Sequence, residues 1–187
     1  MKPVPRTAIL DYVTYEDVRP EMRARVLAAK AARRVHLGDH LTVLFENTLT
    51  VQYQIQEMVR AERLVREADI VHEVETYNAL LGADGELGAT LLIEIDDPAL
   101  RAVKLREWLP LPGHVYVTLD DGTRVPARFD PAQIGEDRLS SVQYLKFPVG
   151  GRVPRALGVD LPGLALDTPL SPEQRAALAE DLGAGGR

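Results

Sequence analysis

The residues whose types and spacing could support chemistry gather in FENTLTVQYQIQEMVRAER, positions 45–63. At about 100° per residue, one stripe of a helix over this segment holds Val51, Ile55, Met58, Glu62 and Val65. Glu62 then lies in an apolar face, where an isolated charge is too unfavourable to persist. We therefore predict that Glu62 lies beneath the surface and is neutralised, with Arg66 four residues later as the nearest partner.

A second flank of the same expected helix carries Gln52, Gln56, Arg60 and Arg63, at spacings of four, four and three. Two interpretations stay open for this donor-rich face. Its polar groups bond to neighbouring backbone, because buried polar groups are nearly always hydrogen-bonded, or they bind a protein partner or a small anionic ligand. The candidate binding residues are Gln52, Gln56, Glu57, Arg60, Glu62, Arg63, Tyr77 and Asn78.

A metal site is the alternative. His72 and Glu75 are three residues apart on the next expected helix, and Glu57 and Glu62 precede them, which suggests oxygen and nitrogen ligands for iron or manganese. Carboxylate-bridged di-iron bundles use two Glu-x-x-His pairs, whereas this chain has one partial match in reversed order. The helical periodicity also puts His72 on the solvent side of its helix.

Other catalytic signatures are missing from the sequence. Cysteine is absent, which excludes disulfides, thiolate nucleophiles and thiolate-bound metals. No serine lies in a Gly-x-Ser-x-Gly elbow, and the glycine-rich segment 82–88 leads into an expected strand rather than a phosphate-binding helix. The sequence thus favours a non-catalytic binding or accessory protein, and leaves open whether the protein is an enzyme.

Composition places the chain among ordinary globular proteins, with 187 residues, 45% hydrophobic and 27% charged. The sequence has no apolar run long enough for a membrane span and no signal-peptide pattern at its start, so we expect a cytoplasmic location. A formal charge of -6 disfavours nucleic acid as a partner. The basic ridge Arg23, Lys30 and Arg34 is interpreted as a solvated face or a contact for an acidic partner.

The elements that must position these residues follow from periodicity and caps. Helices are expected over 20–34, from Asn47 or Thr48, over 70–81, from Pro98 and from Pro172. Strands are expected over 41–45, 89–95 and 141–147, with a hairpin over 114–129. This order predicts an α+β fold, with a mostly antiparallel sheet of about five strands and helices packed on it.

The domain organisation expected is a single α+β domain over residues 1–147. Residues 148–187 extend the same domain as a docked Pro/Gly-rich segment and a C-terminal helix. The last four residues, 184–187, are expected to be disordered.

Five segments carry a resemblance: residues 45–63, 75–81, 88–95, 141–147 and 157–163. Over nearly its whole length the chain resembles the bacterial domain-of-unknown-function family DUF3501, mainly through Gln56, Glu57, Met58, Arg60, Glu62 and Arg63. The family has no activity to transfer. Its genes often lie beside those for rubrerythrin and iron–sulfur oxidoreductases, so the resemblance implies an accessory protein with a partner in redox or peroxide defence. Members often read Gly-Val-Asp-His near the C-terminus, whereas Leu161 follows Asp160 here, which removes a ligand role at that position.

Overall fold

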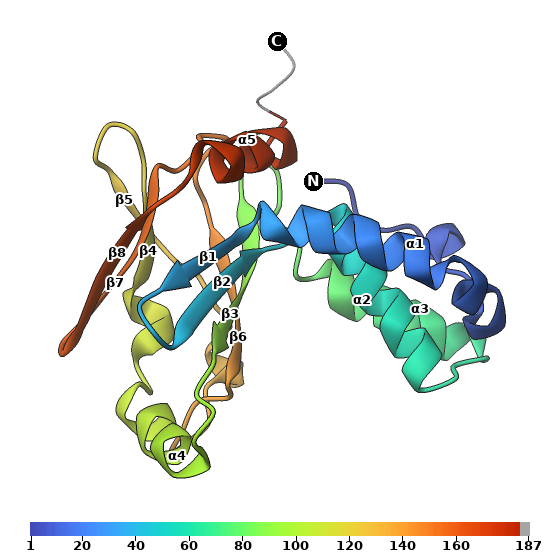
Figure 1. Cartoon of the computed structure of the whole chain (residues 1–187), viewed down its shortest axis with the longest axis horizontal. Helices are drawn as coiled ribbons and strands as arrows, with labels where there is room; N and C mark the ends of the chain where they lie inside the picture. Colours follow the sequence, from blue (N-terminus) through green and yellow to red (C-terminus); the bar gives the residue numbers. More distant parts are fainter. Residues whose placement is uncertain (184–187) are drawn as a thin grey trace.

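Two parts lie side by side in the computed structural model, which describes residues 1–183 (Figure 1). One part contains two β-sheets, and the other is a bundle of three helices. The class is therefore α+β, as predicted, and the sheets are antiparallel throughout. Residues 184–187, which we expect to be disordered, lie outside the described residues.

Each sheet has four strands. The first has the order β1-β2-β3-β6, formed by β1 (Arg34–Leu37), β2 (Leu41–Phe45), β3 (Leu87–Ile93) and β6 (Val142–Phe147). The second has the order β5-β4-β7-β8, formed by β4 (Val115–Thr118), β5 (Arg124–Pro126), β7 (Ala156–Leu161) and β8 (Leu164–Pro169). Strand β5 lies at the edge of its sheet and contains Pro126, which has no N–H to donate to a further strand.

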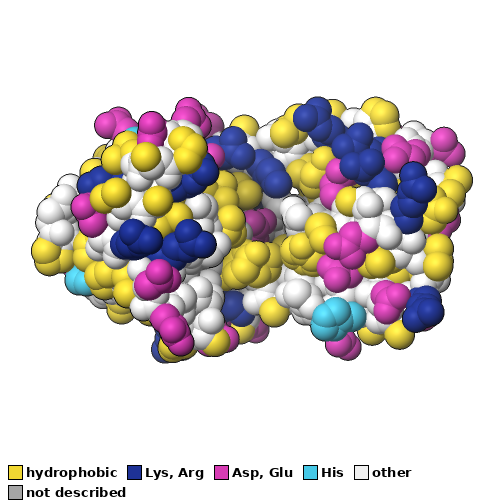
Figure 2. Space-filling model, turned by 90° about the horizontal axis from the view of Figure 1, so that it is seen from below, with side chains coloured by type: hydrophobic (Ala, Val, Ile, Leu, Met, Phe, Trp, Pro, Cys, Tyr) yellow, Lys and Arg dark blue, Asp and Glu magenta, His cyan; other side chains and the backbone are white. Residues whose placement is uncertain are grey.

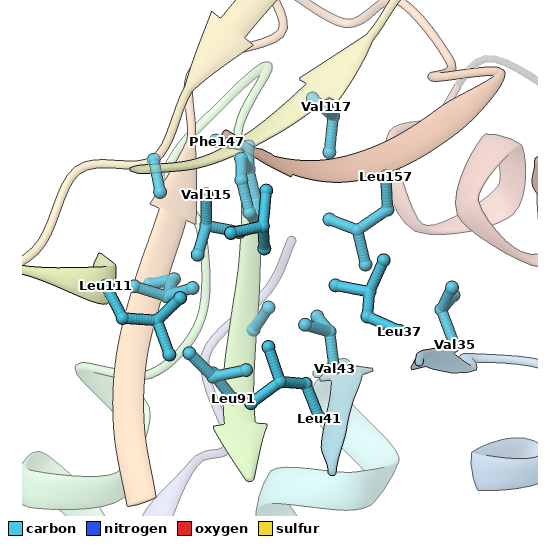
Figure 3. Close-up of a cluster of buried hydrophobic side chains, with 14 of the residues drawn as sticks. Val35, Leu37, Leu41, Val43, Leu91, Leu111, Val115, Val117, Phe147 and Leu157 are labelled. Carbon is cyan, nitrogen blue, oxygen red and sulfur yellow. The ribbon is translucent and has the colours of Figure 1, made fainter. Parts of the chain in front are cut away.

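The main core lies between the two sheets. Because side chains alternate along a strand, one face of each sheet supplies apolar residues to it. Figure 3 shows Leu37 and Val43 of the first sheet close to Val117 and Leu157 of the second, all of them buried. Two further helices, α4 (Pro98–Glu107) and α5 (Pro172–Asp181), add Leu105 and Leu178 to this core.

The helical part has a core of its own. Helices α1 (Tyr12–Ala31), α2 (Thr48–Ala61) and α3 (Glu67–Asn78) form the bundle, together with the N-terminal segment and its short 3₁₀-helix η1 (Arg6–Ala8). The buried residues are Val4, Ile9, Val51, Ile55, Val59, Ile70, Val74 and Leu81. This cluster is separate from the core of the sheets. Side chains of both parts line the space between them.

Helix α1 begins eight residues earlier than the sequence predicts, at Tyr12 instead of Pro20. Asp11 caps the helix by accepting hydrogen bonds from the backbone N–H groups of Val13 and Thr14. Pro20 is therefore inside the helix, where it removes one backbone hydrogen bond. The helix continues through it because α1 packs against α2: the buried Tyr15 donates to Glu57 before the proline, and Val26 is buried after it.

Helix α2 starts at Thr48 with Asn47 as its cap, as predicted, but ends earlier than the sequence pattern indicates. Arg63 has a φ of 51°, the left-handed conformation that favours glycine after a helix. The N–H of Arg63 donates to the carbonyl of Arg60 at 3.3 Å, and that of Leu64 to Val59 at 3.0 Å. These two bonds form a Schellman motif, so the periodic stripe stops before Glu62 and Val65.

The prediction of about five strands is too low because three strands are missed. Residues Arg34–Leu37, assigned to the first helix and its end, form β1, which pairs with β2 in register Val35↔Val43. The supposed extended segment contains β7 and β8, paired in register Val159↔Leu166. These segments form strands because they pair with strands distant in the sequence, as β7 does with β4.

Helix α3 begins at Glu67 and ends at Asn78, in each case three residues before the predicted bounds of 70–81, whereas α4 and α5 begin where the sequence predicts. Asp97 caps α4 ahead of Pro98, and Ser171 forms a capping box with Gln174 at the start of α5. Within residues 1–183, none of the helices combines the length and the apolar character needed to span a bilayer.

Candidate functional site

A hollow of about 310 Å³ lies between the outer face of the first sheet and the helices. We call it the interlobe groove. Its floor is a row of side chains that crosses all four strands, because the register pairs Arg34 with Leu44, Leu44 with Thr90 and Thr90 with Tyr144. Its other wall comes from α2 and α3, through Thr50, Val51, Gln54, Tyr77 and Leu80. Figure 2 shows this hollow between the two parts, with basic side chains on its edge and apolar side chains around it.

Glu46 is the distinctive residue of the groove. It lies between the end of β2 and the cap of α2, and only 8% of it is exposed. Its Oε1 accepts a hydrogen bond from the Thr90 hydroxyl at 2.7 Å, and its Oε2 accepts one from Thr50 at 2.5 Å. Thr50 also accepts the N–H of Asn47 at 2.9 Å, so one hydroxyl completes the helix cap and orients the carboxylate.

The carboxylate of Glu46 has no basic partner among the ion pairs of residues 1–183. Buried charges in proteins are normally paired, since removing a charge from water is costly. Two neutral hydroxyl donors compensate only part of that cost. A positively charged group in the groove would therefore complete the site.

Two basic residues, Lys30 at the end of α1 and Arg34 at the start of β1, line the same groove. Neither side chain forms an ion pair within the described part of the chain. The ammonium of Lys30 lies 5.7 Å from the centre of the Tyr53 ring, a cation–π contact. The groove thus combines a buried negative group with two positive groups.

An adjoining hollow of about 470 Å³ shares Tyr77, Leu80 and Tyr144 with the groove. Its lining also contains Ala79 and Leu145. Because the two hollows share three side chains, the charged groove continues into a more apolar space along α3 and β6.

Three of the predicted binding residues hold the N-terminal segment. The amide of Gln56, only 1% exposed, donates to the carbonyl of Leu10 and accepts its N–H, both at 2.9 Å. Asn78 holds Val4 in the same way, at 2.8 and 2.9 Å, and Gln52 donates to the carbonyl of Ala8 at 3.0 Å. Backbone groups therefore occupy these amides, the first of the two interpretations left open by the sequence.

Glu57 and Arg60 belong to an ion-pair network between α1 and α2. Glu57 accepts hydrogen bonds from Nε and Nη2 of Arg19, at 2.8 and 3.1 Å, and from the Tyr15 hydroxyl at 2.7 Å. Arg60 approaches the same carboxylate at 3.3 Å. The Arg19 guanidinium, together with Tyr15, lowers the pKa of Glu57 to about 2 in spite of its desolvation. Burial and the neighbouring Glu57 raise the pKa of Tyr15.

The prediction that Glu62 is buried is wrong. Glu62 is the C-terminal cap of α2 and is exposed, because the Schellman motif ends the helix before this residue turns inward. It forms no ion pair with Arg66 among those of residues 1–183. Arg63 is exposed beside it.

The four predicted metal ligands do not converge. Glu57 is bound by Arg19, whereas Glu62, His72 and Glu75 are exposed. Over residues 1–183 there is no group of three or more His, Asp or Glu side chains arranged to hold a metal ion. No side chain of α2 therefore joins His72 and Glu75 to form a metal site within residues 1–183.

The sequence analysis missed Glu46; it included Tyr77 among the candidate binding residues, and Lys30 and Arg34 only as part of a basic ridge. One local signal was present: a glutamate placed directly before a helix cap, with a threonine four residues later. The partner Thr90 is 44 residues away and is brought close only by the pairing of β2 with β3.

The fold and the groove define an α+β protein of two antiparallel sheets and a helical bundle, in which a small polar site lies between the first sheet and the bundle. The chain belongs to the family described as "Protein of unknown function (DUF3501)", whose pattern matches residues 3–182. It is similar to a protein of unknown function from Burkholderia pseudomallei K96243, known from a crystal structure. The two are 30% identical, with a TM-score of 0.89 over 97% of this chain and 100% of the other. No curated protein matches the chain.

Proposed function

We propose that this protein is a non-catalytic binding protein that holds a small organic cation in the interlobe groove. The carrying observation is Glu46, a carboxylate 8% exposed that is bound by two hydroxyl groups and by no cation of residues 1–183. A protonated amine in the groove would supply the missing positive charge.

The size and lining of the groove support a small-molecule ligand. Its volume of about 310 Å³ falls at the lower end of the range of ligand pockets. Apolar side chains such as Leu44, Leu80 and Leu92 surround the polar groups, the usual composition of such pockets.

The link to redox or peroxide defence is a separate proposal. It rests on the family resemblance and on no feature of the groove. It predicts that the ligand or a partner protein belongs to that metabolism.

Calorimetry on the full chain tests the proposed function with two probes of similar shape. At about pH 6 leucinamide carries a protonated amino group, whereas N-acetylleucinamide is uncharged. We expect leucinamide to bind and N-acetylleucinamide not to bind. Glu46→Gln should remove the binding, because glutamine keeps the shape of the side chain and loses its charge.

Glu62→Gln is the matched control. Glu62 is an exposed glutamate at the opposite end of α2 from Glu46, and it lies outside the groove. It should bind leucinamide like the unmodified protein. Equal binding of the charged and uncharged probes, or unchanged binding by a folded Glu46→Gln variant, would refute the proposed function.

A further inference from the structure

We infer that the ligand of the interlobe groove is a zwitterion, an amino carboxylate with an apolar body. This inference rests on the proposed function, because it keeps Glu46 as the partner of the ammonium group. It adds a role for Lys30 and Arg34 as the partners of the carboxylate.

The first support is the composition of the groove. Glu46, Lys30 and Arg34 line one continuous hollow, and no ion pair of residues 1–183 connects the basic residues to Glu46 or to another acid. An anion alone would be repelled by Glu46. A cation alone would leave Lys30 and the exposed Arg34 without an anionic partner, whereas a zwitterion satisfies both signs of charge.

The second support is the position of the charges along the sheet. Arg34 belongs to edge strand β1, and Thr90, which holds Glu46, belongs to β3 on the far side of β2. Adjacent strands are about 4.8 Å apart, so the positive and negative groups are offset across the direction of the strands. A ligand lying across the strands would direct its carboxylate toward β1 and its ammonium group toward β2 and β3.

The third support is the apolar space beside the charges. Leu44 of β2 and Leu92 of β3 line the groove from the sheet, and Leu80, in the turn after α3, also lines it. The adjoining hollow of about 470 Å³ continues from Leu80 and Tyr144. An aliphatic or aromatic side chain of an amino acid fits the chemistry of this space, which glycine would leave unfilled.

Calorimetry with three probes separates the two charges of the ligand. Leucine carries both, leucinamide lacks the carboxylate, and N-acetylleucine lacks the ammonium group. We expect leucine to bind at least about tenfold more tightly than either derivative, a ratio that corresponds to the loss of one charged contact. Glycine should bind more weakly than leucine, because it lacks the apolar body.

The double variant Lys30→Gln/Arg34→Gln tests the basic residues directly. It should weaken leucine about tenfold and should not weaken leucinamide, because leucinamide has no carboxylate to contact these side chains and its ammonium group is repelled by them. Arg23→Gln is the control: Arg23 is an exposed basic residue of α1 outside the groove, and its replacement should change neither ligand. Thermal melts of each variant confirm that it is folded.

The failures are distinguishable. If leucine and leucinamide bind with equal affinity, and the double variant changes both affinities by the same factor, the zwitterion inference is refuted while the proposed cation site stands. If N-acetylleucine binds and leucinamide does not, both are refuted. Failure of all three probes to bind at millimolar concentration also refutes both.

Discussion

Arg19 and Glu57 form a two-point ion pair between α1 and α2, with donor–acceptor distances of 2.8 and 3.1 Å. The pair lies half-buried, and the hydroxyl of Tyr15 donates to the same carboxylate. It fastens the part of α1 that precedes Pro20 to the bundle. This is the part of the helix that the sequence pattern does not predict.

The pair makes stability depend on pH in a defined direction. The pKa of Glu57 is about 2 in the folded protein and about 4.5 when the chain is unfolded. Because the folded pKa is the lower one, the stabilisation is complete above about pH 4.5 and is lost as the pH falls toward 2. Urea unfolding at neutral pH should show a loss of about 1 to 2 kcal/mol for Glu57→Gln, after allowance for solvent screening.

Near pH 2.5 most of that difference between Glu57→Gln and the unmodified protein should have disappeared. Glu62→Gln serves as the control, since an exposed glutamate without a partner should change stability by less than about 0.5 kcal/mol. A difference that stays constant from pH 7 to pH 2.5 would contradict the role given to the ion pair.

Arg63→Gly is expected to stabilise the protein by about 0.5 to 1 kcal/mol. Arg63 adopts a φ of 51°, which glycine tolerates without the steric cost of a Cβ atom. Thermal or urea unfolding measures the gain. Arg63→Ala keeps the Cβ atom and should give no gain, so equal stability of the two variants would show that the left-handed conformation is not the cause.

Gln56→Ala should destabilise the protein by about 2 to 3 kcal/mol, because two hydrogen bonds to Leu10 are lost in a buried place. Amide hydrogen exchange at Leu10 should become faster. Gln52→Ala removes one hydrogen bond, to the carbonyl of Ala8, and should cost less. The same cost for both variants would be inconsistent with a two-point contact at Gln56.

Asp181→Asn should destabilise the protein by about 3 kcal/mol and loosen α5 from the end of α1. Arg33 and Asp181 form a buried pair with N–O distances of 2.7 and 2.9 Å, and their side chains are 7% and 8% exposed. Breaking it leaves Arg33 buried without its charged partner. Limited proteolysis near residue 170 reports the release of α5. In the variant, cleavage should begin at temperatures well below the main unfolding transition.

Arg175→Ala provides the comparison for that variant, since Arg175 pairs with Asp120 at 2.7 Å on the surface. Exposed pairs contribute about 0 to 1 kcal/mol, so this change should be nearly silent. Similar losses for the buried and the exposed pair would refute the importance given to burial.

Local sequence determined the caps and the tight turn. Asn47, Asp97 and Ser171 cap three helices that start where the sequence predicts, because a side-chain oxygen can satisfy backbone N–H groups within the first turn. The hairpin of β4 and β5 closes at Gly122, which has a φ of 82°. These features involve neighbours a few residues apart, so the sequence contains all of the necessary information. The predicted class, α+β with antiparallel pairing, followed from the order of such elements.

Tertiary structure decided where the site lies. The sequence predicts a buried Glu62 because an uninterrupted helix would place this residue on its inner face. Arg63 ends that helix in a left-handed conformation, which its residue type does not predict. Glu46 looked unremarkable between a strand and a cap, and becomes buried because β3 brings Thr90 to it. The groove needs β1, β2, β3, β6 and the helices of the bundle together, and contacts between such distant segments leave no periodic pattern in the sequence.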